Sequence, residues 1–159
     1  MNKKNPYQKI DAHIRHKINK LIDNGYEQAA LGTIDKDNLP FVTKVIPVLF
    51  QNRIFILLSD LSEHTRNITA NPVVSLYFAG KEKHKTKSNN SRLTLQGYLK
   101  KLSLNKKEED FTQILEKLSK IDLGCELWAN FEDFNFYEFY EKRKLYVEGF
   151  AKAYEEVKN

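Results

Sequence analysis

Cysteine, methionine and tryptophan are almost missing from this chain of 159 residues, which has one residue of each. The single cysteine, Cys125, excludes an internal disulfide and any metal site built from several thiolates. Long hydrophobic runs are missing too, since Val45 to Phe50 and Ile54 to Leu58 fall far short of the roughly 20 residues that a membrane-spanning helix needs. The opening Met-Asn-Lys-Lys-Asn-Pro has no apolar segment behind it, so we expect no secretory signal. These features predict a soluble cytoplasmic protein without a membrane partner.

The strong motifs of common enzyme classes are also missing. The sequence has no Gly-x-Gly-x-x-Gly, no Walker sequence, no Gly-x-Ser-x-Gly and no His-Glu-x-x-His. Two of the four histidines, His13 and His16, stand one helical turn apart, but two helix histidines alone rarely form a metal site. We therefore expect no bound metal and disfavour a hydrolytic metalloenzyme.

What the chain does contain is enough apolar material for one domain spanning residues 1–159. Hydrophobic residues make up 41% and aromatic residues 12%, which argues against disorder. The formal net charge of +5 permits nucleic acid, a membrane surface or phosphorylated ligands as partners and selects none of them. We expect no nucleic-acid partner. The lysine-rich segment from Lys81 to Lys87 is consistent with a solvated loop or with a segment that closes over an anionic ligand.

Alternating and helical patterns of apolar residues predict the order of secondary structure. A first helix is expected to be capped by Asn5, to begin at Pro6 and to end at Gly25 in the left-handed conformation. Asn105 is expected to cap a later amphipathic helix, and Gly80 to Ser91 is expected to be a mobile loop. Strands are expected at 28–34, 41–50, 53–59, 73–78, 92–100 and 144–151, with a short helix at 60–70.

This order favours a mainly β (α+β) fold. Consecutive strands on tight turns, with helices outside them, suit a small antiparallel barrel better than a βαβ fold. Pro47 cannot donate to a strand ladder, so the 41–50 strand should lie at an edge or bulge at this residue.

The segment with the most chemical information is Leu58 to Asn67, at a strand-to-helix junction. Free backbone N–H groups at a helix start bind anions, and the helix dipole adds a favourable field. Hydroxyls of Ser59, Ser62 and Thr65 and the guanidinium of Arg66 would complete a phosphate site. The same pattern also fits an ordinary capped helix with an exposed arginine.

Several short motifs together resemble the flavin-binding split-barrel family of pyridoxamine 5′-phosphate oxidase. The resemblance is closest to its haem-utilisation (HugZ-like) branch and covers roughly residues 8–152. The motifs are Ala30-Leu31-Gly32-Thr33-Ile34-Asp35 with Pro40, Val45-Ile46-Pro47-Val48, Leu58 to Asn67, Asn71-Pro72, Ser91-Arg92-Leu93-Thr94-Leu95-Gln96-Gly97, Asp133 to Tyr137, and Tyr146 to Phe150.

The resemblance implies a six-stranded antiparallel Greek-key split barrel with flanking helices, working as a homodimer with FMN at the subunit interface. The flavin ring would lie along the backbone of Val45, Ile46 and Pro47. The phosphate would be held by Ser59, Thr65 and Arg66, and Arg92 would reach the cofactor from its own strand. Such a protein would be an oxidoreductase acting on a small-molecule substrate.

Two departures limit what the resemblance implies. The C-terminal arginine and histidine motif that grips pyridoxamine phosphate in the oxidase has no match here, and no histidine follows His84. Three hypotheses therefore stand side by side: an FMN-dependent oxidoreductase, a haem-binding or haem-degrading relative, and a cofactor-free binding module. Cys125 is interpreted as a buried apolar residue, and the aromatic residues between Trp128 and Tyr140 as core or interface packing, or as a surface for a planar ring.

Overall fold

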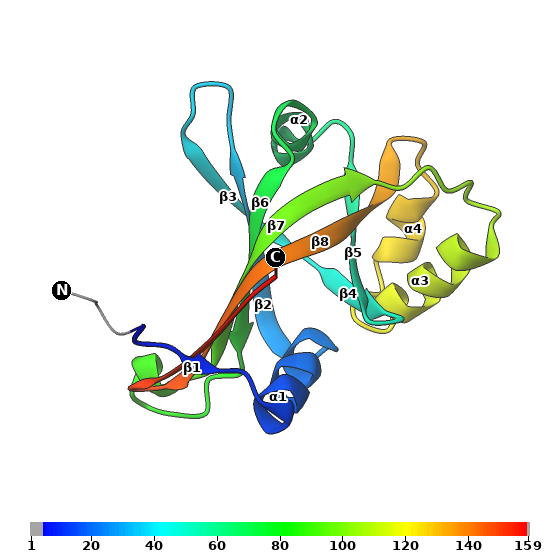
Figure 1. The fold of residues 1–159 in the computed structure, drawn as a ribbon. Coiled ribbons are helices and arrows are strands. Elements are labelled where there is room, and N and C mark those ends of the chain that lie inside the picture. Colours follow the sequence, from blue (N-terminus) through cyan, green and yellow to red (C-terminus); the bar gives the residue numbers. More distant parts are fainter. Residues whose placement is uncertain (1–4, 159) are drawn as a thin grey trace.

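Strands dominate the fold, as the alternating patterns predict. The computed structural model describes residues 5–158, so most of the N-terminal stretch interpreted above as lacking a signal lies outside the described residues. The elements in chain order are β1 (Gln8–Lys9), α1 (Ala12–Ile22), β2 (Tyr26–Ile34), β3 (Pro40–Val45), β4 (Pro47–Phe50), β5 (Arg53–Ser59), α2 (Glu63–Ala70), β6 (Val73–Gly80), a 3-10 turn (Lys87–Asn89), β7 (Arg92–Lys101), α3 (Glu109–Ser119), α4 (Cys125–Ala129), β8 (Phe134–Gly149) and β9 (Lys152–Val157) (Figure 1).

The strands join into one sheet that closes on itself. Hydrogen-bonded neighbours run β3, β2, β6, β7, β8, and β8 also pairs with β5, which pairs with β4. Since β4 continues β3 across the single residue Ile46, the path returns to its start and forms a barrel. Pairing is antiparallel throughout, except between β1 and β9. The mainly β class with flanking helices is thus confirmed.

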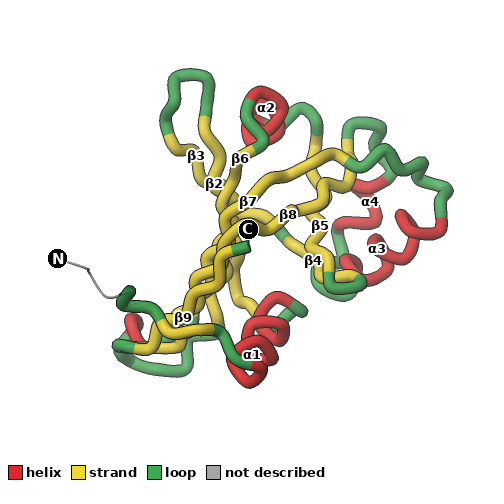
Figure 2. Tube along the Cα trace, viewed as in Figure 1, coloured by secondary structure: helices red, strands yellow, loops and turns green. Residues whose placement is uncertain are grey.

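The sheet has nine strands where six were expected. The break at Ile46 divides one barrel strand into β3 and β4, and the short strands β1 and β9 extend the sheet beyond the barrel. The long strand β8 makes this extension possible, because its first residues, 134–139, pair with β5 and its last ones, 143–149, pair with β9 (Figure 2). Strand β7 pairs along the other edge of β8, with a bulge between Gln96 and Gly97.

Helices α1 and α2 both pack against the apolar core of the barrel. The buried side chains of α1 join the barrel core, and they are Ile14, Ile18, Leu21 and Ile22. Helix α2 connects β5 to β6 and contacts β2 and β3. Buried Asn67 of α2 donates a hydrogen bond from Nδ2 to the Oγ1 of Thr33 in β2, at 3.0 Å. This polar contact fixes α2 against the barrel.

Helices α3 and α4 form a second apolar layer on the outside of β4, β5 and β8. Phe111, Ile114 and Leu118 of α3 are buried there, as the helical pattern predicts, and Phe111 packs edge-on against Phe136 with ring centroids 5.0 Å apart. Cys125 is buried in the same layer, which confirms its interpretation as an apolar residue.

Three predicted helix boundaries were wrong. Helix α1 begins after Asp11, whose side chain accepts the N–H of Ile14 at 2.8 Å, and the residues after Asn5 include strand β1 instead. The left-handed residue after α1 is Asn24, with φ of 59°, and not Gly25. Helix α3 begins after Glu108, while Asn105 forms a turn in which its side chain accepts the N–H of Lys107.

The predicted extent of the last strand was also wrong. A strand was expected only at 144–151, but β8 runs unbroken from Phe134 to Gly149, and β9 follows it. Helix α4 was not predicted, because five residues are too short for a helical pattern to be visible. The strand expected at 41–50 is interrupted next to Pro47, because β3 stops at Val45 and Pro47 opens β4.

The β7–β8 bulge gives the first prediction. A Cβ at Gly97 would lie 2.0 Å from the backbone oxygen of Tyr140, so Gly97→Ala requires the two strands to shift. We expect Gly97→Ala to lower the free energy of unfolding by about 1–3 kcal/mol in urea denaturation. The control is Gly149→Ala, whose Cβ would come no closer than 3.4 Å to any atom. Equal stability of the two variants would contradict this packing.

Candidate functional site

An open cleft of about 530 Å³ lies on the outside of the barrel, beside the break between β3 and β4. Its walls come from the end of β3 with Ile46, the end of β5, the start of α2 and the outer helices α3 and α4. The residues that line it are Lys44, Val45, Ile46, Leu57, Leu58, Ser59, Ser62, His64, Leu118, Asp122, Cys125, Trp128 and Phe134. Its size is within the usual range for sites that hold small molecules.

Ile46 provides backbone groups at the wall of this cleft. Val45 pairs with Ala29 in the β2–β3 ladder and Pro47 pairs with Ile56 in the β4–β5 ladder, but Ile46 belongs to neither ladder. Within residues 5–158 the backbone N–H and carbonyl of Ile46 have no backbone partner, so water or a ligand would have to supply one. Pro47 itself is buried, and its carbonyl accepts a hydrogen bond from the hydroxyl of Tyr26 at 2.8 Å.

One wall of the cleft is aromatic. The rings of Trp128 and Phe134 stack with centroids 6.5 Å apart and an interplanar angle of 28°. Trp128 keeps 40% of its surface exposed, so its ring remains accessible to a ligand. Cys125 lines the same side, and burial raises the pKa of its thiol to about 11, which keeps the sulfur protonated at neutral pH. This wall suits a flat, apolar ring and offers no nucleophile.

The polar rim opposite this wall is organised around the hydroxyl of Ser62. Its oxygen lies 2.7 Å from the carbonyl of Ser59, 2.8 Å from Nε2 of His64 and 3.0 Å from Oγ1 of Thr65. A serine hydroxyl has one proton, and the carbonyl can only accept it, so His64 and Thr65 both donate to Ser62. His64 therefore carries its proton on Nε2, and its Nδ1 is left as an acceptor. Burial lowers the pKa of His64, which favours this neutral form.

Asp60 fixes the junction between β5 and the rim. Its carboxylate accepts hydrogen bonds from the Tyr137 hydroxyl at 3.0 Å, from the Asn135 side chain at 2.9 Å and from Nζ of Lys101 at 2.7 Å. Burial and the contact with Asp60 raise the pKa of Tyr137, so its hydroxyl stays a donor. The start of α2 is thereby tied to strands β7 and β8.

The structure brings some of the predicted cofactor residues together. Val45, Ile46 and Ser59 line the cleft, and Pro47 lies directly beside it. The Ser59 hydroxyl donates to the carboxylate of Asp133 at 2.5 Å and accepts the N–H of Leu61 at 3.1 Å.

Thr65 and Arg66 sit next to the cleft in α2 and do not line it. Thr65 is buried and reaches the rim through its bond to Ser62. The Arg66 side chain is 67% exposed and lies 3.5 Å from the carboxylate of Glu63, which is also exposed. Because exposed ion pairs contribute little, the Arg66 side chain can turn toward another anion at small cost.

Arg92 lies apart from all of these residues. It opens β7 opposite Ala79, near the end of β6, whereas α2 precedes the start of β6 at Val73. Arg92 lines a different cleft of about 570 Å³ on the outer face of β2, β3 and β6, and its guanidinium donates to the carbonyl of Ser88 at 3.1 Å. Lys44 lines both clefts.

Sequence reasoning missed His64 and Asp122 as lining residues, and it named Trp128 only within a group of aromatic residues. His64 stands inside the segment that was singled out, and its two-residue spacing from Ser62 was the available signal. Asp122 and Trp128 come from the region around α4, which no sequence pattern predicted. Within residues 5–158 no group of three or more His, Cys, Asp or Glu side chains is arranged to hold a metal ion. No helix in this range is long and apolar enough for a membrane crossing.

A protein-family model described as pyridoxamine 5′-phosphate oxidase matches residues 14–140. Among curated proteins, none matches this sequence.

Solved structures with the same fold come from several organisms. ChuZ from Campylobacter jejuni is similar with a TM-score of 0.81 at 22% identity, over 94% of this chain and 61% of that one. The heme storage protein HutZ from Vibrio cholerae has a TM-score of 0.65 at 20% identity, over 85% of this chain and 92% of that one. A pyridoxinephosphate oxidase family protein from Clostridium acetobutylicum, related to general stress protein 26, has a TM-score of 0.68 at 14% identity, over 93% and 96%. At these identities the similarity is one of fold.

The neutral state of His64 gives the second prediction. The unfolded chain binds a proton at the ordinary histidine pKa of 6.5, whereas the folded chain binds it only at lower pH. His64 therefore costs no stability above this pKa and makes the parent progressively less stable as the pH falls below it. We expect His64→Gln to gain stability relative to the parent between about pH 7 and pH 5.

The measurement is urea denaturation of parent and variant across this pH range. Other groups titrate equally in both proteins, so the difference isolates His64. A difference that is independent of pH, or that moves in the parent's favour on acidification, would contradict the buried neutral imidazole.

Proposed function

Because the chain belongs to the pyridoxamine 5′-phosphate oxidase family, whose model matches residues 14–140, we propose that it is a flavoprotein oxidoreductase that binds FMN. Its substrate would be a small molecule, and it would act in the cytoplasm as a homodimer. When bound, FMN supplies hydride or electron transfer, while the protein supplies position and electrostatics.

One observation carries this proposal: the unpaired backbone of Ile46 lines the cleft that Trp128 and Phe134 wall. A flavin ring has a polar edge with donors and acceptors and two apolar faces. The residues that would hold the polar edge are Val45, Ile46 and Pro47, and Trp128 and Phe134 would cover an apolar face. These side chains exclude water from the ring, which favours transfer of hydride over side reactions.

The flavin phosphate would lie at the start of α2. Arg66 would leave its exposed contact with Glu63 and bind phosphate oxygens, and the backbone N–H groups of the first turn would add a favourable field. Ser59 and Thr65 would contribute hydroxyls from the rim. The Asp133 carboxylate that now holds Ser59 restricts that hydroxyl, so Arg66 would supply most of the charge.

The position of Arg92 supports the proposed homodimer. Within one chain it is too far along the barrel to join Arg66, so a second copy would have to supply it to the cofactor. The outer face of β2, β3, β6 and β7 suits such a contact, because Val42, Val73 and Tyr77 expose 67%, 49% and 40% of their surfaces there. Small residues, among them Ala30 and Ser75, lie between them and let another sheet approach closely.

A haem-binding function is the second candidate, and His64 favours it. A neutral imidazole with a free Nδ1, placed at an apolar cleft, is the type of group that ligates haem iron. In that case Arg92 would pair with a propionate. A cofactor-free binding module is the third candidate, since the fold alone does not fix the function.

FMN titration provides the third prediction. Trp128 is the only tryptophan and lines the cleft, so bound FMN should quench the intrinsic tryptophan emission. We expect Arg66→Ala to weaken FMN binding about tenfold to hundredfold, because a charge-assisted contact contributes about 1.5–3 kcal/mol. Stability should change by no more than about 0.5 kcal/mol, since Arg66 is exposed.

The matched control is Lys85→Ala, which removes one positive charge from an exposed position outside the cleft. It should leave FMN affinity unchanged. Equal losses in both variants would indicate general charge attraction and contradict the phosphate site. Absence of FMN binding together with a Soret band on addition of haem would support the second candidate. Binding of neither cofactor would support the third.

The fourth prediction concerns the dimer. Light scattering at micromolar concentration should give the mass of two chains. A stable interface of this kind buries roughly 1,600 Å² in total. Tyr77→Glu places a charge in the middle of the proposed contact face and should produce monomers with weakened FMN binding. The control variant Phe150→Glu changes an exposed aromatic residue (84% exposed) outside that face and should remain dimeric. A stable parental monomer would contradict an interface site.

A further inference from the structure

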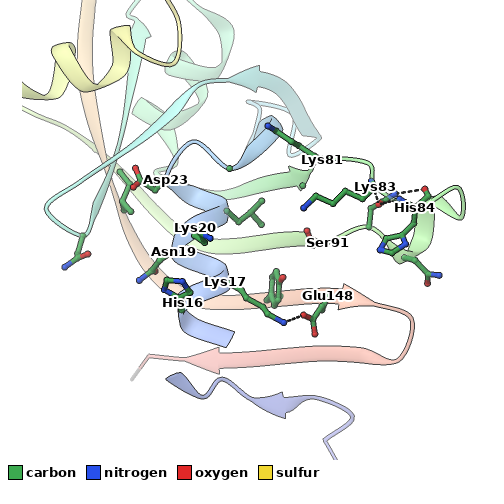
Figure 3. A pocket seen from close by; sticks show the side chains of 18 residues that line it. His16, Lys17, Asn19, Lys20, Asp23, Lys81, Lys83, His84, Ser91 and Glu148 are labelled. Carbon is green, nitrogen blue, oxygen red and sulfur yellow. Dashed lines mark hydrogen bonds and ion pairs between the residues drawn. The ribbon is translucent and has the colours of Figure 1, made fainter. Parts of the chain in front are cut away.

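A second open cleft, larger than the candidate cofactor site, is separate from it. It has a volume of about 890 Å³ and lies between α1 and the loop that joins β6 to β7 (Figure 3). His16 and Lys20 of α1 face it from one side, and Lys81, Lys83 and His84 of the loop face it from the other. It shares no lining residue with the cleft beside Ile46.

Four lysines line this basic cleft, and three of them, Lys20, Lys81 and Lys83, have no acidic partner. Its two acidic lining residues already have partners, because Glu148 pairs with Lys17 and Asp23 lies 3.0 Å from Lys117. Within residues 5–158, no carboxylate oxygen lies within 4.0 Å of the ammonium groups of the three lysines. The cleft therefore presents unpaired positive charge from two facing walls.

The loop that carries two of these lysines is held in place by a buried side chain. Asn90 is only 7% exposed, and its Oδ1 accepts the backbone N–H of Lys83 at 2.8 Å and that of His84 at 3.0 Å. Its Nδ2 donates to the carbonyls of His84 and Lys87, each at 3.3 Å. Asn90 thus orders the loop before any ligand arrives, which lowers the entropy cost of binding.

We propose that the basic cleft binds a polyphosphate chain. Lysine ammonium groups act as point charges toward phosphate oxygens, and a chain of phosphates offers several such oxygens, so it can contact lysines on both walls. A flat macrocycle would find little aromatic surface to stack on, because Tyr146, the tyrosine in the lining, is only 4% exposed. The phosphate chain can be free or part of a nucleotide, since the cleft recognises the charges that both share.

The test is calorimetric titration of the full chain with inorganic tripolyphosphate, and with ATP in a parallel arm. The parent should bind tripolyphosphate, and Lys81→Ala/Lys83→Ala should bind it at least tenfold more weakly. The matched control, Lys36→Ala/Lys85→Ala, removes the same charge from exposed positions outside the cleft and should change affinity less than twofold. Equal affinity for both ligands would identify the phosphate chain as sufficient, and tighter ATP binding would add a nucleoside contact.

Two further variants keep the proposal falsifiable if the double variant folds poorly. Lys20→Ala changes the opposite wall and should weaken tripolyphosphate binding several-fold. Asn90→Ala removes no charge, yet it should also weaken binding several-fold because it releases the loop. Absence of parental binding, equal losses in the control, or full affinity in Lys20→Ala would each overturn the proposal. FMN affinity should be unchanged in the double variant, which separates this test from that of the proposed function.

Discussion

The structure depends on one strand that must serve two ladders. Residues 40–50 pair first with β2 and then with β5, and the change of partner takes place at Ile46, just before a proline that has no N–H to donate. Side chains continue to alternate across the break, so Val45 faces the barrel core while Ile46 and Val48 face the outer helices. The same bend closes the barrel and exposes backbone at a surface cleft. Closure and the candidate site are therefore two results of one constraint.

Polar groups near this bend stabilise the fold and shape the site together. Ser62 joins the end of β5 to α2 and fixes which nitrogen of His64 carries the proton, while Asp60 ties the same junction to Tyr137 in β8. A buried network of this kind is favourable only when its members are satisfied, which limits how far they can move. A ligand would thus meet a rim that is already ordered, beside an exposed Arg66 that can reorient.

The sequence predicted the parts of this molecule that depend on periodicity, and missed the parts that depend on distant contacts. Alternation located the barrel strands, and the proline located the break, because both act within a few residues. The start of α1 could not be predicted, since the segment before Asp11 gains strand partners only from β9, at the other end of the chain. Likewise, Val45 and Ser59 were placed in one site by resemblance, but the separation of Arg92 from Arg66 depends on the register of β6 with β7. Trp128 was seen only as part of an aromatic group, because α4 is too short to leave a pattern.

The closed barrel also imposes an order on folding. The pairing of β5 with β8 joins residues far apart in sequence, as the ion pair of Arg53 with Glu138, 85 positions away, illustrates. Closing so long a loop costs more chain entropy than forming the hairpin of β4 and β5, so local pairs form faster than the pairing that completes the ring. Helices α3 and α4 lie inside this loop, and the outer apolar layer needs Phe136 of β8. The cleft beside Ile46 therefore takes shape only when β5 and β8 pair, and a nascent chain lacks the candidate site until β8 has been synthesised.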